Sequence, residues 1–259
     1  MPPVFLRLAA VAGLAAMLAF LSPDPARAAN DNFSPAQKKQ VEEIVRQYLL
    51  KNPELLIEAI NTLRAREEAE EAKGQGDAIA SRRAELERDP ASPVGGNPKG
   101  DVTLVEFFDY RCGYCKRAHE SVQALVKADG NIRLVYKEFP LLGPESLFAA
   151  RAALAAFKIA PDKYLALHNK LMAMPSGAVK EESVMAEVKN AGLDVKAVRK
   201  RMDDPAVAKD LERVQDLAQG LRLRGTPSFV IGDILIPGAV DGDTLKKVVA
   251  EVRAAKKKS

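Results

Sequence analysis

Two amphipathic helices are predicted near the start of the chain, because apolar residues recur there at the spacing of one helix face. The first helix begins at Ser34-Pro35, and the second begins after Asn52-Pro53. The two apolar stripes consist of Val41, Ile44, Val45, Tyr48 and Leu49, followed by Leu55, Leu56, Ala59, Ile60 and Leu63. Helices of this length bury little surface by themselves, so each stripe needs a partner to cover it.

Residues 74–93 are predicted to form a linker that contains a short helix. The sequence becomes strongly charged after Arg64, and Gly74 and Gly76 are expected to end the second helix. The stripes could pack on the core of the same chain or on another copy of this segment. Because the linker separates residues 30–73 from the rest of the chain, we favour self-association.

The rest of the chain alternates between apolar runs typical of strands and stretches with helical period. Strands are expected at 102–108, at 132–139 and on both sides of the two-residue turn Gly232-Asp233. Residues 143–222 are predicted to form a block of helices, and a last helix is expected at 243–256. This order predicts an α/β (α+β) fold: a mixed sheet with helices on its faces and a helical subdomain inserted in the middle.

The first 29 residues have the pattern of a secretory signal peptide. Arg7 precedes an uncharged run over residues 8–21, and Ala26-Arg27-Ala28 supplies the small residues of a cleavage site. The alternative is an uncleaved membrane anchor, but the run is shorter than the roughly 20 residues that a spanning helix needs. We therefore expect export to an oxidising compartment, where a cysteine pair can be a disulfide or a disulfide catalyst.

The composition is that of an ordinary globular protein. Of its 259 residues, 47% are hydrophobic, and the formal net charge of +4 is small for this length. No motif for nucleic-acid recognition is present, so no nucleic-acid partner is expected.

The only two cysteines of the chain, Cys112 and Cys115, are spaced C-x-x-C where a predicted strand passes into a predicted helix. A thiol at a helix N-terminus faces unpaired backbone N–H groups and the positive end of the helix dipole, which favour the thiolate. Cys112 is therefore the predicted nucleophile. Cys115 lies one turn into the helix and is predicted to resolve the mixed disulfide.

Three other uses of the cysteine pair fit the sequence less well. A structural disulfide across two residues closes too small a loop to stabilise much. A zinc site needs more ligands, and only His119, expected on a helix surface, and His168, expected to be structural, could join. Haem attachment requires a histidine directly after the second cysteine, where this chain has Lys116. No metal and no cofactor are expected.

Two motifs carry a resemblance to a known family. The segment Phe107-Phe108-Asp109-Tyr110-Arg111-Cys112-Gly113-Tyr114-Cys115-Lys116, with Gly225-Thr226-Pro227-Ser228-Phe229 much later in the chain, resembles the thioredoxin-fold DsbA family of periplasmic thiol–disulfide oxidoreductases. The resemblance covers roughly Val94 to Lys256. The stretch from Tyr48 to Glu54 resembles the amino-terminal domain of ScsC-like proteins (suppressor of copper sensitivity C), which in some members forms trimers and confers disulfide isomerase activity.

The resemblance also implies roles for residues near the cysteines. It implies that Pro227 is cis and lies beside the sulfurs, which leaves the backbone of Thr226 free to pair with an extended substrate; the alternative is a trans loop proline. It matches Glu106 and Lys137 to a buried acid and lysine beneath the site, where Glu106 could take the proton of the second thiol. The alternative is that both point to solvent.

Gly113 and Tyr114 set the environment of the sulfurs, and in the resembling family this dipeptide tunes how oxidising the pair is. The DsbA oxidase dipeptide carries a histidine that this chain lacks. The resemblance therefore leaves the redox potential open.

Together these observations predict an exported, periplasmic thiol–disulfide oxidoreductase. By resemblance it is a trimeric disulfide isomerase or reductase for unfolded or misoxidised exported proteins, in which several active sites meet one client. It would take electrons from a membrane-bound thiol–disulfide donor. The alternatives are a monomeric dithiol oxidase and, from another class, a copper(I)-binding or chaperone module. The predicted parts are a signal peptide over 1–29, a helical oligomerisation domain over 30–73, the linker over 74–93 and a DsbA-like thioredoxin domain over 94–259.

Overall fold

The computed structural model describes residues 33–257, so the signal peptide expected over residues 1–29 lies outside the described residues. In chain order the elements are α1 (Pro35–Lys51), α2 (Glu54–Ser81), α3 (Arg83–Glu87), β1 (Val94–Gly96), β2 (Val102–Phe108), α4 (Gly113–Asp129), β3 (Ile132–Glu138), α5 (Pro144–Ile159), the 3-10 turn η1 (Pro161–Lys163), α6 (Tyr164–Ala173), the 3-10 turn η2 (Ser176–Ala178), α7 (Glu181–Asn190), α8 (Val195–Met202), α9 (Pro205–Gly220), β4 (Ser228–Ile231), β5 (Ile234–Pro237) and α10 (Gly242–Lys256). Within residues 33–257, no helix is both long and apolar enough to cross a membrane.

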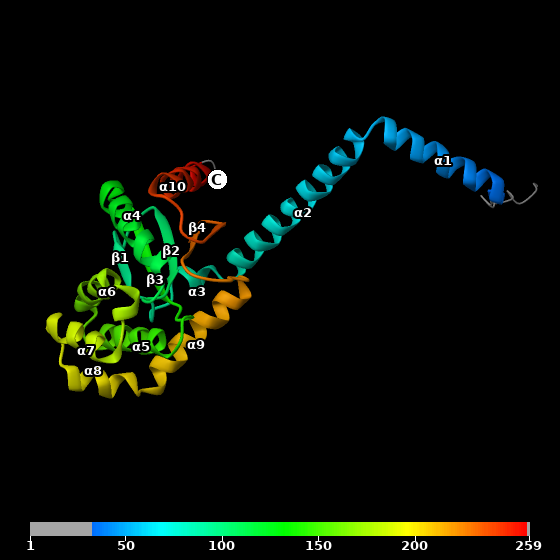
Figure 1. The fold of residues 1–259 in the computed structure, drawn as a ribbon. Coiled ribbons are helices and arrows are strands. Elements are labelled where there is room, and N and C mark those ends of the chain that lie inside the picture. Colours follow the sequence, from blue (N-terminus) through cyan, green and yellow to red (C-terminus); the bar gives the residue numbers. More distant parts are fainter. Residues whose placement is uncertain (1–32, 258–259) are drawn as a thin grey trace, which may run out of the picture. The chain divides into compact units, whose positions relative to one another are not determined.

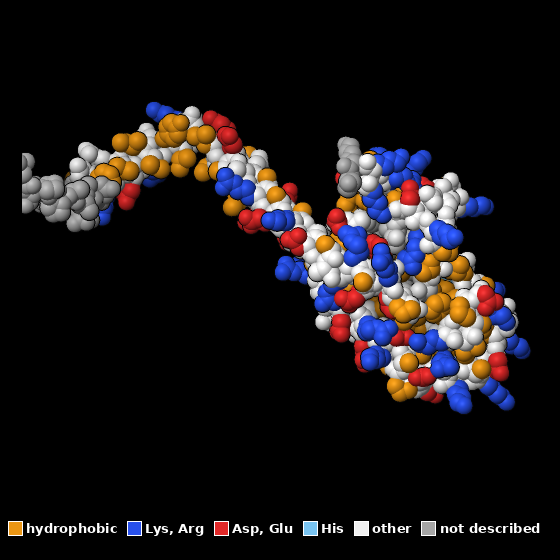
Figure 2. Space-filling view, turned by 180° about the vertical axis from the view of Figure 1, so that it is seen from behind, with side chains coloured by type: hydrophobic (Ala, Val, Ile, Leu, Met, Phe, Trp, Pro, Cys, Tyr) orange, Lys and Arg blue, Asp and Glu red, His pale blue; other side chains and the backbone are white. Residues whose placement is uncertain are grey.

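The chain divides into two units, of which the first ends at Leu63. Ser34 caps α1 as predicted: its hydroxyl accepts from the Gln37 N–H at 3.3 Å, and the Gln37 side chain accepts from the Ser34 N–H at 2.9 Å. No residue of α1 is buried. The exposed large apolar side chains of this unit include Val41, Ile44, Val45, Tyr48, Leu56, Ile57, Ile60 and Leu63. Figure 2 shows hydrophobic side chains on the surface of the helices in this part of the chain. Among residues 33–63, therefore, nothing covers the predicted stripe.

The helix break predicted at Gly74 and Gly76 is wrong, because both residues lie inside α2. An added Cβ at either glycine would meet no described residue within 4 Å, so no close packing in this part of the chain requires glycine there. Each glycine costs a helix about 1 kcal/mol relative to alanine. The alanine, glutamate and lysine residues that precede Gly74 favour helix, and the buried Ile79 holds the following turn.

The second unit is built on a five-stranded sheet in the order β1-β3-β2-β4-β5. The central strand β2 runs parallel to β3 and antiparallel to β4, and the outer pairs are antiparallel. The two-residue turn predicted at Gly232-Asp233 joins β4 to β5, and Gly232 has the positive φ (61°) that such a turn requires. This confirms the predicted mixed sheet.

Helices cover both faces of the sheet (Figure 1). Leu104 and Phe108 of β2 pack on one face with residues of α4, α6 and α10. Phe107 packs on the opposite face with Ile79 of α2, Leu86 of α3 and several residues of α9. Ile79 and Leu86 are each only 1% exposed, so parts of the segment predicted as a linker belong to the core of this unit.

The helices predicted between the second and third long strands are present as α5 to α9. The alanine-rich α5 packs on α9 through Ala150 and Leu154 against Val207 and Leu211. Small side chains let the two helices approach closely, so this helical block forms a compact layer beside the sheet.

Candidate active site

Both cysteines lie where β2 passes into α4, as the sequence predicts. Cys112 is the N-cap of α4, and its sulfur accepts a hydrogen bond from the Cys115 N–H at 3.3 Å. The sulfur thus takes the place of the oxygen in an ordinary cap and pairs with a donor that the helix leaves free. Both residues are free thiols in this structure, Cys112 with 6% and Cys115 with 0% of its surface exposed.

The two thiols differ strongly in acidity. A hydrogen bond from the Cys115 thiol lowers the pKa of Cys112 to about 6, although burial acts against this. The Thr226 side chain and the backbone N–H groups of Cys115 and Tyr114 add to the lowering. Burial raises the pKa of the Cys115 thiol, and its hydrogen bond to Cys112 adds to that shift. At neutral pH Cys112 is therefore a thiolate while Cys115 keeps its proton, which is the combination that thiol–disulfide exchange uses.

The loop that leads into β4 lies against the Cys112 sulfur. The Thr226–Pro227 peptide bond is cis, as the resemblance implied, and the Thr226 carbonyl oxygen lies 3.3 Å from the sulfur. The Ser228 hydroxyl donates to the Gly225 carbonyl at 2.8 Å, a hydrogen bond that joins the residues on either side of Thr226 and Pro227. The backbone of Thr226 is thereby held within contact distance of the thiolate.

The carboxylate of Asp109, a residue not predicted from sequence to act in the site, organises the loops beside the cysteines. It is 2% exposed. It accepts four hydrogen bonds of 2.7–3.0 Å, from the N–H groups of Arg111, Leu141 and Leu142 and from the Ser146 hydroxyl. These bonds join the turn ahead of Cys112 to the loop that follows β3. The one sequence signal for this role is an acidic residue directly after the apolar run of β2.

Gly113 and Tyr114 occupy the positions between the cysteines. Tyr114 is 61% exposed, and the guanidinium of Arg117 lies over its ring, 4.4 Å from the centroid. An added Cβ at Gly113 would meet its nearest atoms only at 3.8 Å, so the position has room. This side of the turn is therefore open to an approaching protein.

Glu106 is fully buried in β2 and does not point to solvent. Its register partner on β3 is Tyr136, which belongs to the hydrophobic cluster on the α4 face of the sheet. Neither carboxyl oxygen has a hydrogen-bond partner among the described residues, and burial raises the pKa of Glu106 to about 8. At pH 7 the side chain is mostly a neutral acid with both oxygens unpaired.

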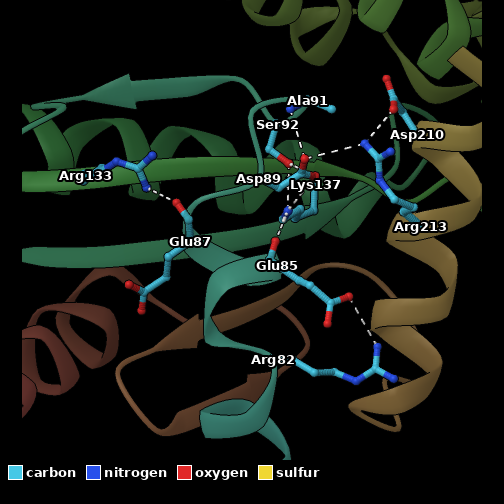
Figure 3. Close-up of polar contacts among 10 residues, drawn as sticks. All are labelled: Arg82, Glu85, Glu87, Asp89, Ala91, Ser92, Arg133, Lys137, Asp210 and Arg213. Atoms are coloured by element: carbon cyan, nitrogen blue, oxygen red, sulfur yellow. Dashed lines mark hydrogen bonds and ion pairs between the residues drawn. The ribbon is translucent and has the colours of Figure 1, made fainter. Parts of the chain in front are cut away.

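Lys137 is also buried, but on the opposite face of the sheet. Its register partner is Phe107, the neighbour of Glu106, and successive strand residues face opposite sides. Its Nζ donates to the Glu85 carbonyl at 2.6 Å, to the Ser92 hydroxyl at 2.7 Å and to the Asp89 carboxylate at 3.4 Å (Figure 3). Burial lowers the pKa of Lys137 to about 8. The structure therefore separates the acid and the lysine that the resemblance placed together.

The contacts of Lys137 fasten the segment between α3 and β1 onto the sheet. Asp89 also accepts from the Ser92 hydroxyl at 3.0 Å and lies 3.6 Å from the Arg213 guanidinium. On the same segment the Glu87 carbonyl accepts from Arg133 of β3 at 2.6 Å (Figure 3). These polar contacts supplement the burial of the neighbouring apolar residues.

Two histidines lie on the α4 face of the sheet. His168 of α6 is fully buried, with Nδ1 3.0 Å from the Tyr110 hydroxyl, and its ring centroid lies 5.2 Å from that of His119. The sequence predicts that His119 lies on a helix surface. In the structure its side chain is only partly exposed, because it packs against His168. Burial lowers the pKa of both imidazoles. In the part of the chain that the structure describes, no three histidine, cysteine or acidic side chains gather into a group that could hold a metal ion.

Two family descriptions match this chain. Residues 103–250 match the DSBA-like thioredoxin domain, and residues 37–70 match the copper resistance protein ScsC N-terminal domain. The first match spans β2, the cysteine turn and the Thr226–Pro227 loop. The second spans most of α1 and the first part of α2.

Individual proteins agree with both matches. The chain is similar to a thioredoxin-like oxidoreductase from Silicibacter pomeroyi DSS-3, with 48% identity over 66% of this chain and 98% of that one and a TM-score of 0.64. It is similar to a linker-deletion variant of Proteus mirabilis ScsC, with 32% identity over 87% of this chain and 99% of that one and a TM-score of 0.65. It is also 25% identical to disulfide bond formation protein D of Bacillus subtilis over 166 residues, which are 61% of this chain and 75% of that protein.

Proposed function

Since the chain belongs to the family of DSBA-like thioredoxin domains and is a thiol–disulfide oxidoreductase of the DsbA and ScsC type, we propose that it exchanges disulfides with client proteins through Cys112 and Cys115. The observation that carries the proposal is the contrast between the two sulfurs. Cys112 caps a helix and has a pKa of about 6, whereas burial raises the pKa of Cys115 three residues later. Cys112 can therefore attack as a thiolate, whereas Cys115 stays protonated until it resolves the mixed disulfide.

The exchange begins when the Cys112 thiolate attacks one sulfur of a client disulfide. A mixed disulfide forms between Cys112 and the client, and the other client sulfur leaves as a thiolate. In isomerisation another client thiolate attacks the client sulfur of this bond, which frees Cys112 without net oxidation or reduction. In reduction Cys115 loses its proton and attacks the Cys112 sulfur, so the client leaves with two electrons and the pair is oxidised.

We assign the proton of Cys115 to Glu106. The carboxyl lies on the α4 face of the sheet without a partner among the described residues. With a pKa of about 8, a minor fraction of Glu106 is ionised at pH 7, and this carboxylate form accepts the proton. Lys137 has contacts that support an anchoring role instead, because its ammonium is fully engaged on the other face.

We assign client binding to the loop of Thr226 and Pro227 and to the exposed side of the cysteine turn. An extended client segment would pair with the Thr226 backbone beside the Cys112 sulfur. Tyr114 and Gly113 would contact the client and tune the potential of the pair. Both lie in the turn that is open to solvent.

The uncovered stripe of the first unit supports self-association, which we propose to give a trimer. Ile44 and Tyr48 are 66% and 58% exposed in a helix with no buried residue. Fully burying one large apolar side chain stabilises by roughly 1.5–3 kcal/mol, so several per chain can offset the entropy lost on association. The ScsC N-terminal match covers the same segment.

A trimer would bring several Cys112 thiolates to one client and keep their local concentration high, which favours isomerisation. We propose that residues 1–29 direct export to the periplasm, that residues 30–73 form the oligomerisation domain, and that a membrane-bound thiol–disulfide donor keeps the pair reduced. Without such a donor an oxidising compartment would convert the pair to its disulfide.

Insulin reduction and reactivation of a disulfide-scrambled client test the chemistry. Cys112→Ser should abolish both activities, and Ser121→Ala on the same helix should keep them. Full activity of Cys112→Ser would overturn dithiol catalysis. Light scattering tests the assembly: a chain starting at residue 30 should be a trimer, and one starting at Asp77 a monomer. If both are monomers, the isomerase proposal fails while the oxidoreductase remains.

A further inference from the structure

We propose that Lys116 is a positioning residue for the redox pair: the carbonyl end of α6 holds its ammonium beside the two sulfurs, where it stabilises the Cys112 thiolate. The inference rests on the proposed function, because it concerns the acidity of the sulfur that attacks. Through this contact α6, which belongs to the inserted helical block, would affect the chemistry of the cysteine pair.

The placement of Lys116 follows from α4 and α6. Lys116 directly follows Cys115 and lies four residues after Cys112, and residues four apart occupy the same face of a helix. Its Nζ donates to the carbonyl of Leu171 at 2.9 Å and to that of Met172 at 3.3 Å. The last carbonyls of a helix lack partners within it and form the negative end of its dipole. These carbonyl groups hold the ammonium in place without cancelling its charge, as a carboxylate would.

The charged and titratable groups that face the ammonium come from three elements. The turn before α4 contributes Asp109, and α4 contributes both sulfurs and His119. His168 faces it from α6. Burial keeps both imidazoles neutral at pH 7, so neither competes with Lys116 as the cation beside the pair. The Asp109 carboxylate is already engaged by four hydrogen bonds.

The neighbouring arginines are engaged elsewhere. Arg117 lies over the exposed ring of Tyr114, and Arg111 pairs with Glu145 at 2.8 Å. Burial lowers the pKa of Lys116 itself to about 8, and the sulfurs and Asp109 act against that shift. Lys116 is therefore charged at pH 7, in a partly buried position where a charge acts more strongly than in water.

The test uses Lys116→Met, which removes the charge and the donors, and Lys116→Gln, which keeps an N–H donor without charge. Lys116→Arg keeps the charge, and Arg117→Gln is the matched control for loss of a neighbouring cation. The thiolate is titrated by its absorbance at 240 nm, and the dithiol–disulfide equilibrium is measured against glutathione. Both readouts use the full chain and need no client.

Lys116→Met and Lys116→Gln should raise the pKa of Cys112 by about half a unit, less than loss of the hydrogen bonds that lower this pKa most. A shift of about half a unit from a pKa of about 6 lowers the ratio of reduced to oxidised protein about 2.5-fold at pH 7 and fixed glutathione, because the reduced form loses thiolate stabilisation. Lys116→Arg and Arg117→Gln should stay close to the wild type in both readouts.

An unchanged thiolate titration and glutathione equilibrium in Lys116→Gln would overturn the inference, even if the variant melts at a lower temperature. Lys116 would then only cap α6. If Lys116→Met does not fold, Lys116→Gln decides alone. A wild-type pair that forms no disulfide with glutathione would instead overturn the proposed function.

Discussion

Replacing Cys115 with alanine removes the hydrogen bond that contributes most to the acidity of Cys112. The pKa of Cys112 is lowered from an ordinary value of 9.0 to about 6, first by the Cys115 thiol and then by the Thr226 side chain and backbone N–H groups, which the substitution leaves in place. A hydrogen bond to a charged group is worth about 1.5–3 kcal/mol, and 1.36 kcal/mol corresponds to one pKa unit. Cys115→Ala should therefore raise the pKa of Cys112 by about one to two units.

Alkylation by iodoacetamide, followed by intact mass at a series of pH values, measures this shift. Only the thiolate reacts, so the rate is full above the pKa and falls about ten-fold per pH unit below it. The wild-type rate should be half-maximal near pH 6 and level above pH 7. Cys115→Ala should reach half its maximum between about pH 7 and 8, and Cys115→Ser, which keeps a hydroxyl donor, should lie between the two. A Cys115→Ala profile still centred near pH 6 would show that the Cys115 thiol does not lower the pKa of Cys112.

Three further predictions concern stability and assembly. Burial raises the pKa of Glu106 from 4.5 to about 8, so the folded state binds the extra proton and stability falls as pH rises between these values. The free energy of unfolding of the wild type should fall by about 3 kcal/mol between pH 4.5 and 7, and Glu106→Gln should not show this loss. Denaturant titrations that give both proteins the same dependence of stability on pH would contradict this. Ile44→Glu puts a charge into the exposed stripe and should dissociate the oligomer in light scattering, whereas Arg46→Glu, off the stripe, should not; a persistent Ile44→Glu oligomer would exclude this surface. Asp89→Ala leaves the buried Lys137 ammonium without its carboxylate and should destabilise by about 3 kcal/mol, more than Lys137→Met, which removes the charge. If chemical denaturation shows Lys137→Met to be the less stable of the two variants, Asp89 does not stabilise the Lys137 ammonium.

The features that depend on nearby residues could be predicted from sequence. The start of α1 follows from the Ser34 capping box, and the β4–β5 turn follows from Gly232-Asp233. The place of Cys112 at the start of α4 follows from the change of period after β2. In each case the chain neighbours that fix the conformation are only a few residues away.

The features that depend on register and long-range packing could not be predicted from sequence. Lys137 and Glu106 face opposite sides because β2 pairs with β3 in one particular register. Asp109 binds a loop that follows a different strand, and Lys116 binds the end of a helix far along the chain. The helix continues through Gly74 because good helix formers precede it and Ile79 packs in the core after it, although the two glycines themselves disfavour helix.

Trapping the mixed disulfide identifies the sulfur that attacks the client. The Cys115→Ser variant is incubated with a client peptide that contains one disulfide, quenched with acid and digested for mass spectrometry. We expect a stable adduct on Cys112 that the wild type forms only transiently, because Cys115 resolves it. No adduct with Cys115→Ser, or an equally abundant adduct on Cys115 in Cys112→Ser, would contradict the assignment of Cys112 as the attacking sulfur.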